Sequence, residues 1–225
     1  MRGLAPQPKS PAASRHGANP RTARDHGVPG GSDDPCMTAR RRTAAQNNTS
    51  EVLGQGRLDL PGIGPLWLAW TDAGLVRVAW ADGDAPAPFE EARIYKRIPG
   101  RFTKPLKAYA KGKDVDPARE VPVDLRGTAF QREVWNALRE VPRGRVRTYS
   151  GIAADIGRPR AMRAVGVANG RNPVPIVVPC HRIVGAGHTL GGYSGGLPRK
   201  RALLTLEGVK FEGEHLLPGQ LALFE

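Results

Sequence analysis

The sequence has few cysteines and no long apolar run, and both absences narrow the class of protein that it can encode. Its two cysteines, Cys36 and Cys180, form no C-x-x-C pair. Two isolated cysteines and five scattered histidines supply neither a disulfide framework nor a ligand set for a structural metal. No apolar stretch approaches the roughly 18 residues that a membrane-spanning helix requires. The N-terminus lacks the apolar core of a signal peptide. We therefore expect a cytoplasmic protein in a reducing compartment.

Acidic residues are nearly missing from residues 143–201. This stretch contains eleven basic residues, ten of them arginine, and Asp155 is its single acid. The net charge of the whole chain is +13, so most of the positive excess is concentrated here. The planar guanidinium group of arginine matches phosphate, and a basic face speeds encounter with a polyanion. The pattern favours a polyanionic partner, with a merely basic soluble surface as the alternative.

Residues 1–52 are rich in Pro, Gly, Ser, Arg and Asn and have no periodic apolar positions, which is typical of a disordered, basic tail. One hypothesis is that translation starts at Met37, just before the basic run 40–42. That run is either a solvated tail or an electrostatic arm for nucleic acid. We assign no role to Cys36, which lies in the same segment.

The remaining chain divides into two predicted domains, 53–126 and 127–212, and a C-terminal tail, 213–225. In the first domain, apolar alternation between Gly- and Pro-containing breakers predicts an antiparallel meander. Its strands are expected over 57–60, 64–70 and 75–80, followed by a helix over 102–111 and a strand near 121–125. We expect no chemistry in this domain.

The second domain begins with an amphipathic helix. Thr128 is a suitable N-cap, and Phe130, Val134 and Leu138 recur at helical spacing. The helix should end near residues 142–144, and we expect Trp135 to lie in the core.

Two shorter helices follow, over 148–157 and 160–169, joined by a turn that contains glycine. Such a pair predicts a helix-turn-helix. We expect Ala161, Ala164, Val165 and Ala168 on the inward side of the second helix. Its small residues would also allow the helix to approach another molecule closely.

The tetrapeptide Pro179-Cys180-His181-Arg182 carries the most specific chemical signal. The apolar run 176–178 predicts a strand that ends at the proline and holds the thiol at the edge of a pocket. A neighbouring base or positive charge would lower the pKa of the thiol and make it a nucleophile. The alternative is an inert core cysteine, because free cysteine is often buried.

A series of motifs then follows a fixed order along the chain. They are Thr148-Tyr149, Arg163-Ala164-Val165-Gly166, Asn169-Gly170-Arg171-Asn172-Pro173, Ile176-Val177-Val178-Pro179-Cys180-His181-Arg182, Gly192-Tyr193-Ser194-Gly195-Gly196, Lys200 and Glu207-Gly208. This series resembles the methylated-DNA–protein-cysteine methyltransferases, also called O6-alkylguanine-DNA alkyltransferases. The resemblance is close over 128–208 and looser over 57–125.

The resemblance implies an α+β fold and a single-use repair protein. The fold would comprise a disordered N-terminal tail, a small ribonuclease H-like α/β domain and a mainly helical domain with a helix-turn-helix. The protein would move a methyl or other alkyl group irreversibly from O6 of guanine in DNA to Cys180, with O4 of thymine as a second candidate target. No cofactor and no metal would be needed, and the protein would act as a monomer.

The resemblance also implies roles for residues of the catalytic site. Cys180 would be the nucleophile, His181 would remove its proton through a water, and Glu207 would orient that histidine. Tyr149 would donate to N3 of the base, and Asn172 would tie the recognition helix to the active-site segment.

Further residues would contact the damaged DNA. Extrusion of the nucleotide is needed because the target atom is inaccessible in a duplex. Arg163 would fill the space that the base vacates, with its helix, including Ala164, in the minor groove. Arg158, Arg160 and Arg171 would contact phosphates.

The loop after the active-site segment admits two interpretations. In the family, Tyr193 and the glycines after it wall the alkyl pocket, and the Ser194 backbone N–H donates towards O6. Otherwise these residues only shape a loop. Lys200 is either a family lysine near the pocket or a solvated charge, and Glu207 could simply cap a helix. His188 and His215 are expected at the surface.

Two other functions stay open. One is a damage-binding protein without transfer, although alkyltransferase-like sensors replace the cysteine that is present here. The other is a cysteine hydrolase built from Cys180, His181 and Glu207. Adjacent residues on a strand point to opposite sides, which argues against the hydrolase.

Overall fold

The computed structural model describes residues 52–83 and 85–220. They belong to one compact unit. Predictions for the N-terminal tail, including those on Cys36, Met37 and the run 40–42, lie outside the described residues. Within the described ranges, no helix is long and apolar enough to cross a membrane.

The first part is the predicted antiparallel meander. Its strands are β1 (Gly54–Leu60), β2 (Gly64–Trp70) and β3 (Leu75–Trp80), paired in the order β1-β2-β3. Gly62, with φ of +76°, adopts the left-handed conformation in the turn between β1 and β2. Leu58, Leu66 and Leu68 point into the core.

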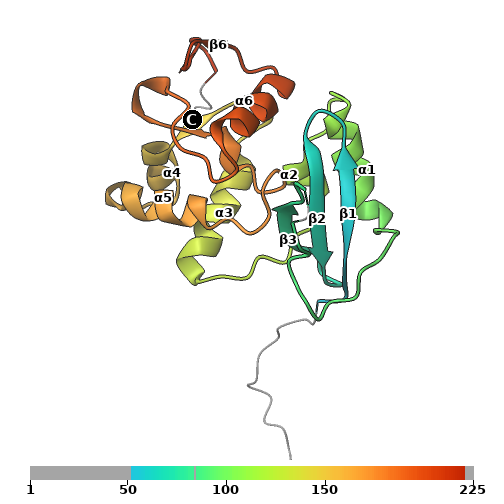
Figure 1. Ribbon diagram of the computed structural model, residues 1–225. Helices are drawn as coiled ribbons and strands as arrows, with labels where there is room; N and C mark the ends of the chain where they lie inside the picture. The colour runs from blue at the N-terminus through green and yellow to red at the C-terminus, as the bar shows by residue number, and fades with distance from the viewer. Residues whose placement is uncertain (1–51, 84, 221–225) are drawn as a thin grey trace, which may run out of the picture. The chain divides into compact units, whose positions relative to one another are not determined.

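Helix α1 (Gly100–Ala110) packs beside this sheet, as Figure 1 shows. Phe102, Leu106 and Tyr109 recur at helical spacing and are buried. The predicted strand near 121–125 is wrong, because this segment makes only an isolated parallel bridge between Val123 and Leu75. Pro122 has no N–H to extend the ladder. The short helix α2 (Pro117–Glu120) comes just before it.

Helix α3 (Ala129–Glu140) begins as predicted. The Thr128 hydroxyl accepts from the Gln131 backbone N–H, and the Gln131 side chain accepts in return from the Thr128 backbone N–H, which is a capping box. Trp135 is buried, and its Nε1 donates to the Ala168 carbonyl at 2.8 Å. This confirms its place in the core and joins α3 to the second helix of the pair that follows.

That pair consists of α4 (Tyr149–Asp155) and α5 (Met162–Gly170), joined through the 3-10 helix η1 (Pro159–Ala161). Gly157, with φ of +69°, allows the turn. Val165 and Ala168 are buried as predicted, whereas Ala164 is exposed. The expectation that Ala164 faces inward is therefore wrong.

The apolar run 176–178 is not the predicted strand. It forms a tight turn in which the Val178 N–H donates to the Val174 carbonyl at 2.8 Å. Ile176 has φ of +74°, an unusual value for a β-branched residue. Prolines at 173, 175 and 179 lack the N–H groups that a strand would need. Apolarity here reflects burial in the core and not strand pairing.

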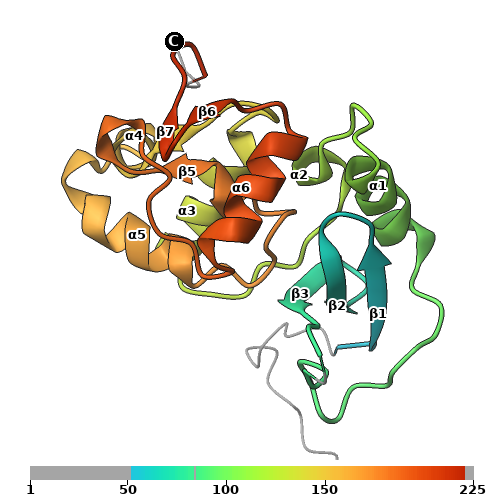
Figure 2. The same ribbon diagram turned by 45° about the horizontal axis from the view of Figure 1, so that its top comes forward.

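The last part contains short elements and one long helix. The helices are the 3-10 helices η2 (Cys180–Arg182) and η3 (Ala186–His188) and the α-helix α6 (Leu197–Leu206). The strand β5 (Ile183–Val184) pairs in parallel with β4 (Arg147–Thr148), which lies just before α4. The strands β6 (Phe211–Glu212) and β7 (His215–Leu216) form an antiparallel pair. Figures 1 and 2 both show α3, α4, α5 and α6 grouped to one side of the sheet β1-β2-β3 and α1. Leu216 of β7 is buried in a second apolar cluster.

Candidate active site

Cys180 lies in the core at the first position of η2, with 2% of its surface exposed. The Asn172 Nδ2 donates to its Sγ at 3.0 Å and to the Val178 carbonyl at 2.7 Å. The Asn172 Oδ1 accepts from the Val174 N–H at 3.0 Å, which orients the amide. The side chain of Asn172 thus links the end of α5, the turn at 174–178 and the thiol.

His181 and Glu207 form a buried pair beside this thiol. The His181 Nε2 lies 3.0 Å from the Glu207 Oε1. A carboxylate only accepts, so Nε2 carries the proton of the neutral ring and Nδ1 is an acceptor. Nδ1 is buried and has no hydrogen-bond partner among the described residues. Burial lowers the pKa of His181 despite the neighbouring carboxylate, which favours the neutral ring.

Arg182 binds the other side of the Glu207 carboxylate. Its Nε lies 3.0 Å from the Glu207 Oε2, and its Nη2 lies 2.9 Å from Oε1. The same guanidinium group reaches Asp116, with Nη2 2.8 Å from Oδ1. Burial alone would lower the pKa of Arg182, but the two carboxylates raise it. Burial would likewise raise the pKa of Glu207, yet His181 and Arg182 lower it well below its usual range.

The segment predicted as the first domain, residues 53–126, therefore contributes to the site, against the expectation of no chemistry there. The hydroxyl of Tyr109, on α1, donates to the Glu207 Oε1 at 2.8 Å. Asp116 also caps α2 through the Ala118 N–H. Sequence reasoning missed both residues, because their partners lie some 66 to 98 positions away along the chain. Arg182 belongs to the tetrapeptide that the sequence singled out, but the sequence did not predict that its side chain is buried.

Lys200 is fully buried and is not a solvated charge. Its Nζ donates to the carbonyls of Ile183 at 2.5 Å, Gly192 at 3.3 Å and Leu190. Burial lowers its pKa to about 8, although the nearby Cys180 opposes this shift. Lys200 thus fastens the chain after Cys180 to α6.

Opposing effects act on the pKa of the Cys180 thiol. Burial raises the pKa of Cys180, whereas the Asn172 hydrogen bond and the charge of Lys200 lower it. The net direction is upward, so the resting protein holds a thiol at neutral pH. A base must therefore act if this sulfur is to attack.

Two tyrosines lie near the sulfur. Tyr149, at the start of α4, is partly buried, and burial and Cys180 raise the pKa of its hydroxyl. Tyr193 has a buried hydroxyl, and burial and its interaction with Cys180 raise its pKa as well. Ser194 is exposed next to it. A side chain at Gly195 would collide with the Tyr193 ring and with Trp80, so glycine is required there.

The residues predicted to contact DNA lie on the exposed side of η1 and α5. Arg160, Arg163, Ala164 and Arg171 are exposed, and no ion pair involves these arginines within the described part of the chain. Arg158 differs, because it lies 3.1 Å from Glu133 and over the Phe130 ring.

The geometry also bears on the hydrolase hypothesis. Cys180 and His181 share a 3-10 helix and not a strand, so the argument from strand alternation does not apply. The sulfur is hydrogen-bonded to Asn172, and no hydrogen bond joins it to His181 among the described residues. A direct nucleophile-base contact is thus missing from this part of the chain.

Comparisons with known proteins agree with one another. The family described as "6-O-methylguanine DNA methyltransferase, DNA binding domain" matches residues 129–209. The methylated-DNA–protein-cysteine methyltransferase of Mycobacterium tuberculosis is 43% identical over 172 residues, which cover 75% of this chain and 96% of that protein. The protein of the same name from Methanosarcina acetivorans is 46% identical over 150 residues, which cover 65% of this chain and 93% of that protein.

Solved structures lead to the same family. The O6-methylguanine methyltransferase of M. tuberculosis superposes with a TM-score of 0.62 at 42% identity, covering 68% of this chain and 92% of that one. The structure of M. tuberculosis OGT in complex with DNA superposes with a TM-score of 0.61 over the same shares of the two chains. The chain belongs to the family of methylated-DNA–protein-cysteine methyltransferases.

Proposed function

We propose that this protein repairs O6-alkylguanine in DNA by direct reversal, moving the alkyl group to the Cys180 sulfur in a single, irreversible turnover. A bond forms between sulfur and the alkyl carbon while the bond from that carbon to O6 breaks, and the guanine leaves with a proton. The observation that carries the proposal is the buried Cys180 thiol, hydrogen-bonded to Asn172, beside the His181–Glu207 pair in a chain of this family.

Activation of the thiol is assigned to His181. Its Nδ1 is an unpartnered, buried acceptor, which suits a base that takes the thiol proton through one water. Glu207 holds the ring in the required tautomer and stabilises the imidazolium that forms. Arg182 and Tyr109 in turn orient the carboxylate. Lys200 adds a positive charge that favours the thiolate.

Stabilisation of the leaving guanine is assigned to Tyr149 and Ser194. The Tyr149 hydroxyl has a raised pKa, so it stays protonated and can donate to N3 of the base. The Ser194 backbone N–H would donate towards O6, where charge develops as the bond breaks. Tyr193 would wall the alkyl pocket.

Delivery of the base is assigned to α4 and α5. The nucleotide must leave the stack, at a cost of a few kcal/mol that is lower for a mispaired lesion. Arg163, exposed and free of ion pairs in the described residues, would occupy the vacated space. The small exposed Ala164 suits close approach to a minor groove about 6 Å wide. Ala168 is buried and cannot serve this purpose. Arg160 and Arg171 would contact phosphates.

The finer architecture is also part of the proposal. The sheet β1-β2-β3 with α1 would be the family's ribonuclease H-like domain, and residues 127–212 would form the alkyltransferase domain. We expect a monomer that acts in the cytoplasm on double-stranded DNA.

The test is the mass of the protein after reaction with an oligonucleotide that contains O6-methylguanine. The wild type should gain one methyl group, and peptide mapping should locate it on Cys180. The Cys180→Ala variant should bind the same duplex and gain nothing, whereas Cys36→Ala should react like the wild type. Repair of the lesion with an unmodified Cys180 would contradict the proposal. Binding without transfer in the wild type would favour a damage sensor.

A further inference from the structure

A second basic region lies in the first domain, outside the arginine-rich stretch 143–201. Residues 93–113 contain eight Lys or Arg and no Asp or Glu. This segment, which we call the α1 basic segment, runs from the loop before α1 to just past its end. The charge needs an explanation of its own, since none of these basic side chains contacts Cys180, His181 or Glu207 among the described hydrogen bonds and ion pairs.

Helix α1 separates its apolar and basic side chains. Phe102, Leu106 and Tyr109 are buried. Lys104, Lys107 and Lys111 follow at spacings of three and four residues and are all exposed. Side chains at this spacing share one face, and successive ammonium groups start roughly 5 Å apart along the axis. The face is a row of cations.

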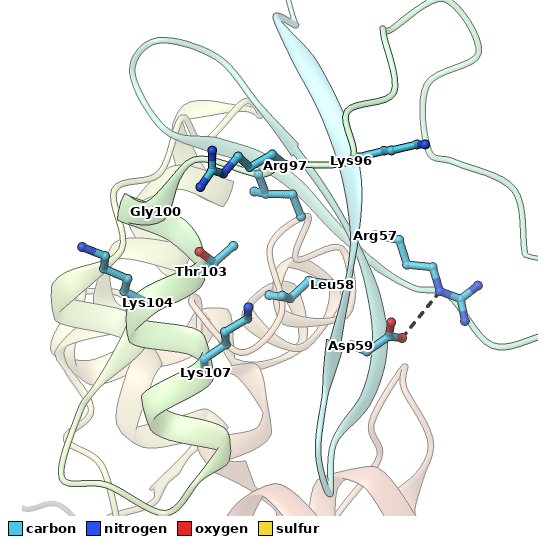
Figure 3. Close-up of a pocket in the computed structure, with 10 residues that line it drawn as sticks. Arg57, Leu58, Asp59, Lys96, Arg97, Gly100, Thr103, Lys104 and Lys107 are labelled. Atoms are coloured by element: carbon cyan, nitrogen blue, oxygen red, sulfur yellow. Dashed lines mark ion pairs between the residues drawn. The ribbon is translucent and has the colours of Figure 1, made fainter.

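A cavity of about 640 Å³ lies beside this row, between α1, the segment before it and β1. In Figure 3, Thr103 and Lys107 point towards the hollow, and Arg97 borders it. Its basic lining residues are Arg57, Lys96, Arg97, Lys104 and Lys107. The single acid is Asp59, which pairs with Arg57 at 3.6 Å.

Within the described part of the chain, the other cations of the cavity have no carboxylate partner in an ion pair. Among the described residues, none of Arg97, Lys104 and Lys107 forms an ion pair. The first turn of α1 contains no acid, and the helix lacks a side-chain cap. Arg97 lies just before the helix, at the positive end of its dipole, where a cation is repelled; Lys107, in the last turn, is not subject to this repulsion. An external anion would relieve this repulsion.

We propose that the basic face of α1 and the adjoining cavity bind the phosphate backbone of DNA, without sequence preference, at a stretch of duplex other than the one that α5 engages. The partner rests on the proposed function, in which DNA is the substrate. The lining favours a backbone over a small phosphate ligand, because its basic side chains are exposed and mostly lysine. Lysine acts as a mobile point charge, which suits contacts that add affinity and carry no sequence information.

The two surfaces belong to different parts of the unit. In Figures 1 and 2, α1 lies beside the sheet, whereas α4 and α5 lie among the helices of the second domain. A duplex of about one helical turn on α5 would leave α1 free, while a longer duplex or a second one could reach it.

The experiment compares Lys104→Gln/Lys107→Gln with Arg77→Gln/Lys210→Gln. Both double variants remove two exposed cations that form no ion pair within the described residues, but Arg77 and Lys210 lie outside both basic surfaces. Affinity for unmodified duplexes of about one and about four helical turns is measured against salt concentration. On the long duplex, the slope of log affinity against log salt should be shallower by about 2 for the α1 variant than for the wild type. The slope of the control variant should equal that of the wild type. On the short duplex, all three proteins should agree.

Three results would overturn the inference. One is an unchanged slope for the α1 variant on the long duplex, and another is an equal loss on the short duplex, which would place α1 within the footprint of α5. The third is thermal stabilisation of the wild type, but not the α1 variant, by tripolyphosphate without any change in DNA binding, which would indicate a small-anion site. Methyl transfer to Cys180 from a short methylated duplex is followed in parallel. Its failure in the wild type would contradict the proposed function alone, and its retention in the α1 variant shows that the variant is folded.

Discussion

The surroundings of Cys180 and the exposed side of α5 use arginine in opposite ways. Arg182 is fully buried, and its guanidinium group meets two carboxylates and the Val141 carbonyl. Arg163 on α5 is exposed and has no ion pair among the described residues. The arginine side chain is thus buried and fully hydrogen-bonded in one region, and exposed without an ion pair among the described residues in the other.

Burial explains the difference. A charge removed from water must be paired and hydrogen-bonded, or it costs several kcal/mol. An exposed charge is solvated and stays available for an outside phosphate. The Arg182 network therefore holds Glu207 beside His181, and the exposed arginines of α5 remain available to the DNA that the proposed function requires.

The largest expected effect comes from breaking the buried network. Glu207→Gln removes the charge that pairs with Arg182 and orients His181, so the free energy of unfolding at pH 7 should fall by about 3 kcal/mol. Methyl transfer should slow in parallel, because the histidine loses its partner. Urea unfolding measures the first effect. The control, Glu140→Gln, breaks an exposed pair with Arg119 and should cost less than about 1 kcal/mol. Equal losses in the two variants would remove the distinction between buried and exposed pairs.

The pH dependence of stability sharpens the same point. The folded pKa of Glu207 is depressed below the ordinary value of 4.5, so its contribution is fully present above that pH and is lost as pH falls below it. His181, also depressed, contributes above its ordinary value of 6.5 and loses this contribution as the unfolded chain takes up protons below that pH. The stability gap between wild type and Glu207→Gln should therefore be constant near neutral pH and narrow below pH 4.5. A gap that widened on acidification would contradict the assigned shift.

Arg163→Ala tests the exposed region. Loss of the side chain that fills the vacated space should slow transfer from duplex DNA about tenfold, a loss of about 1.4 kcal/mol, while the rate with a free O6-alkylguanine base should not change. Single-turnover kinetics with both substrates measures this difference. Arg77→Ala, on β3, is the matched control and should react like the wild type. Equal losses on both substrates would show that Arg163 does not act on base extrusion.

The smallest expected effect separates two neighbouring arginines. Arg158 is engaged by Glu133 and Phe130, whereas Arg160 is not paired among the described residues. Arg160→Ala should therefore make the salt dependence of DNA binding shallower by about 1, and Arg158→Ala should change it less. Arg158→Ala should instead cost up to about 1 kcal/mol of stability. A larger change in salt dependence for Arg158→Ala than for Arg160→Ala would mean that the ion pair between Arg158 and Glu133 opens when DNA binds.

Local patterns predicted the regular elements well. The meander, the capped start of α3 and the glycine turn after α4 follow from alternation, a Thr-Gln capping pair and a residue that tolerates positive φ. The errors fall where local signals are ambiguous. The apolar run 176–178 is as compatible with a buried turn as with a strand, and the prolines around it decide for the turn.

The site divides in the same way. Cys180, His181, Asn172 and Glu207 could be selected from motif order, because their residue types carry chemistry. Tyr109 and Asp116 could not, since an ordinary tyrosine of a helix and an ordinary N-cap acquire their contacts only when distant segments meet.

The sequence by itself determined the family, the cysteine proposed as the nucleophile and the concentration of arginine near it, because these depend on the order and type of residues. The tertiary structure decided which charges are neutralised internally and which remain available. The fold brings Arg182, Glu207 and Asp116 together and shields them from solvent, whereas Arg163 and the lysines of α1 remain exposed to water. The strength of an electrostatic interaction depends on distance and on exclusion of solvent, and neither can be read from positions along a chain.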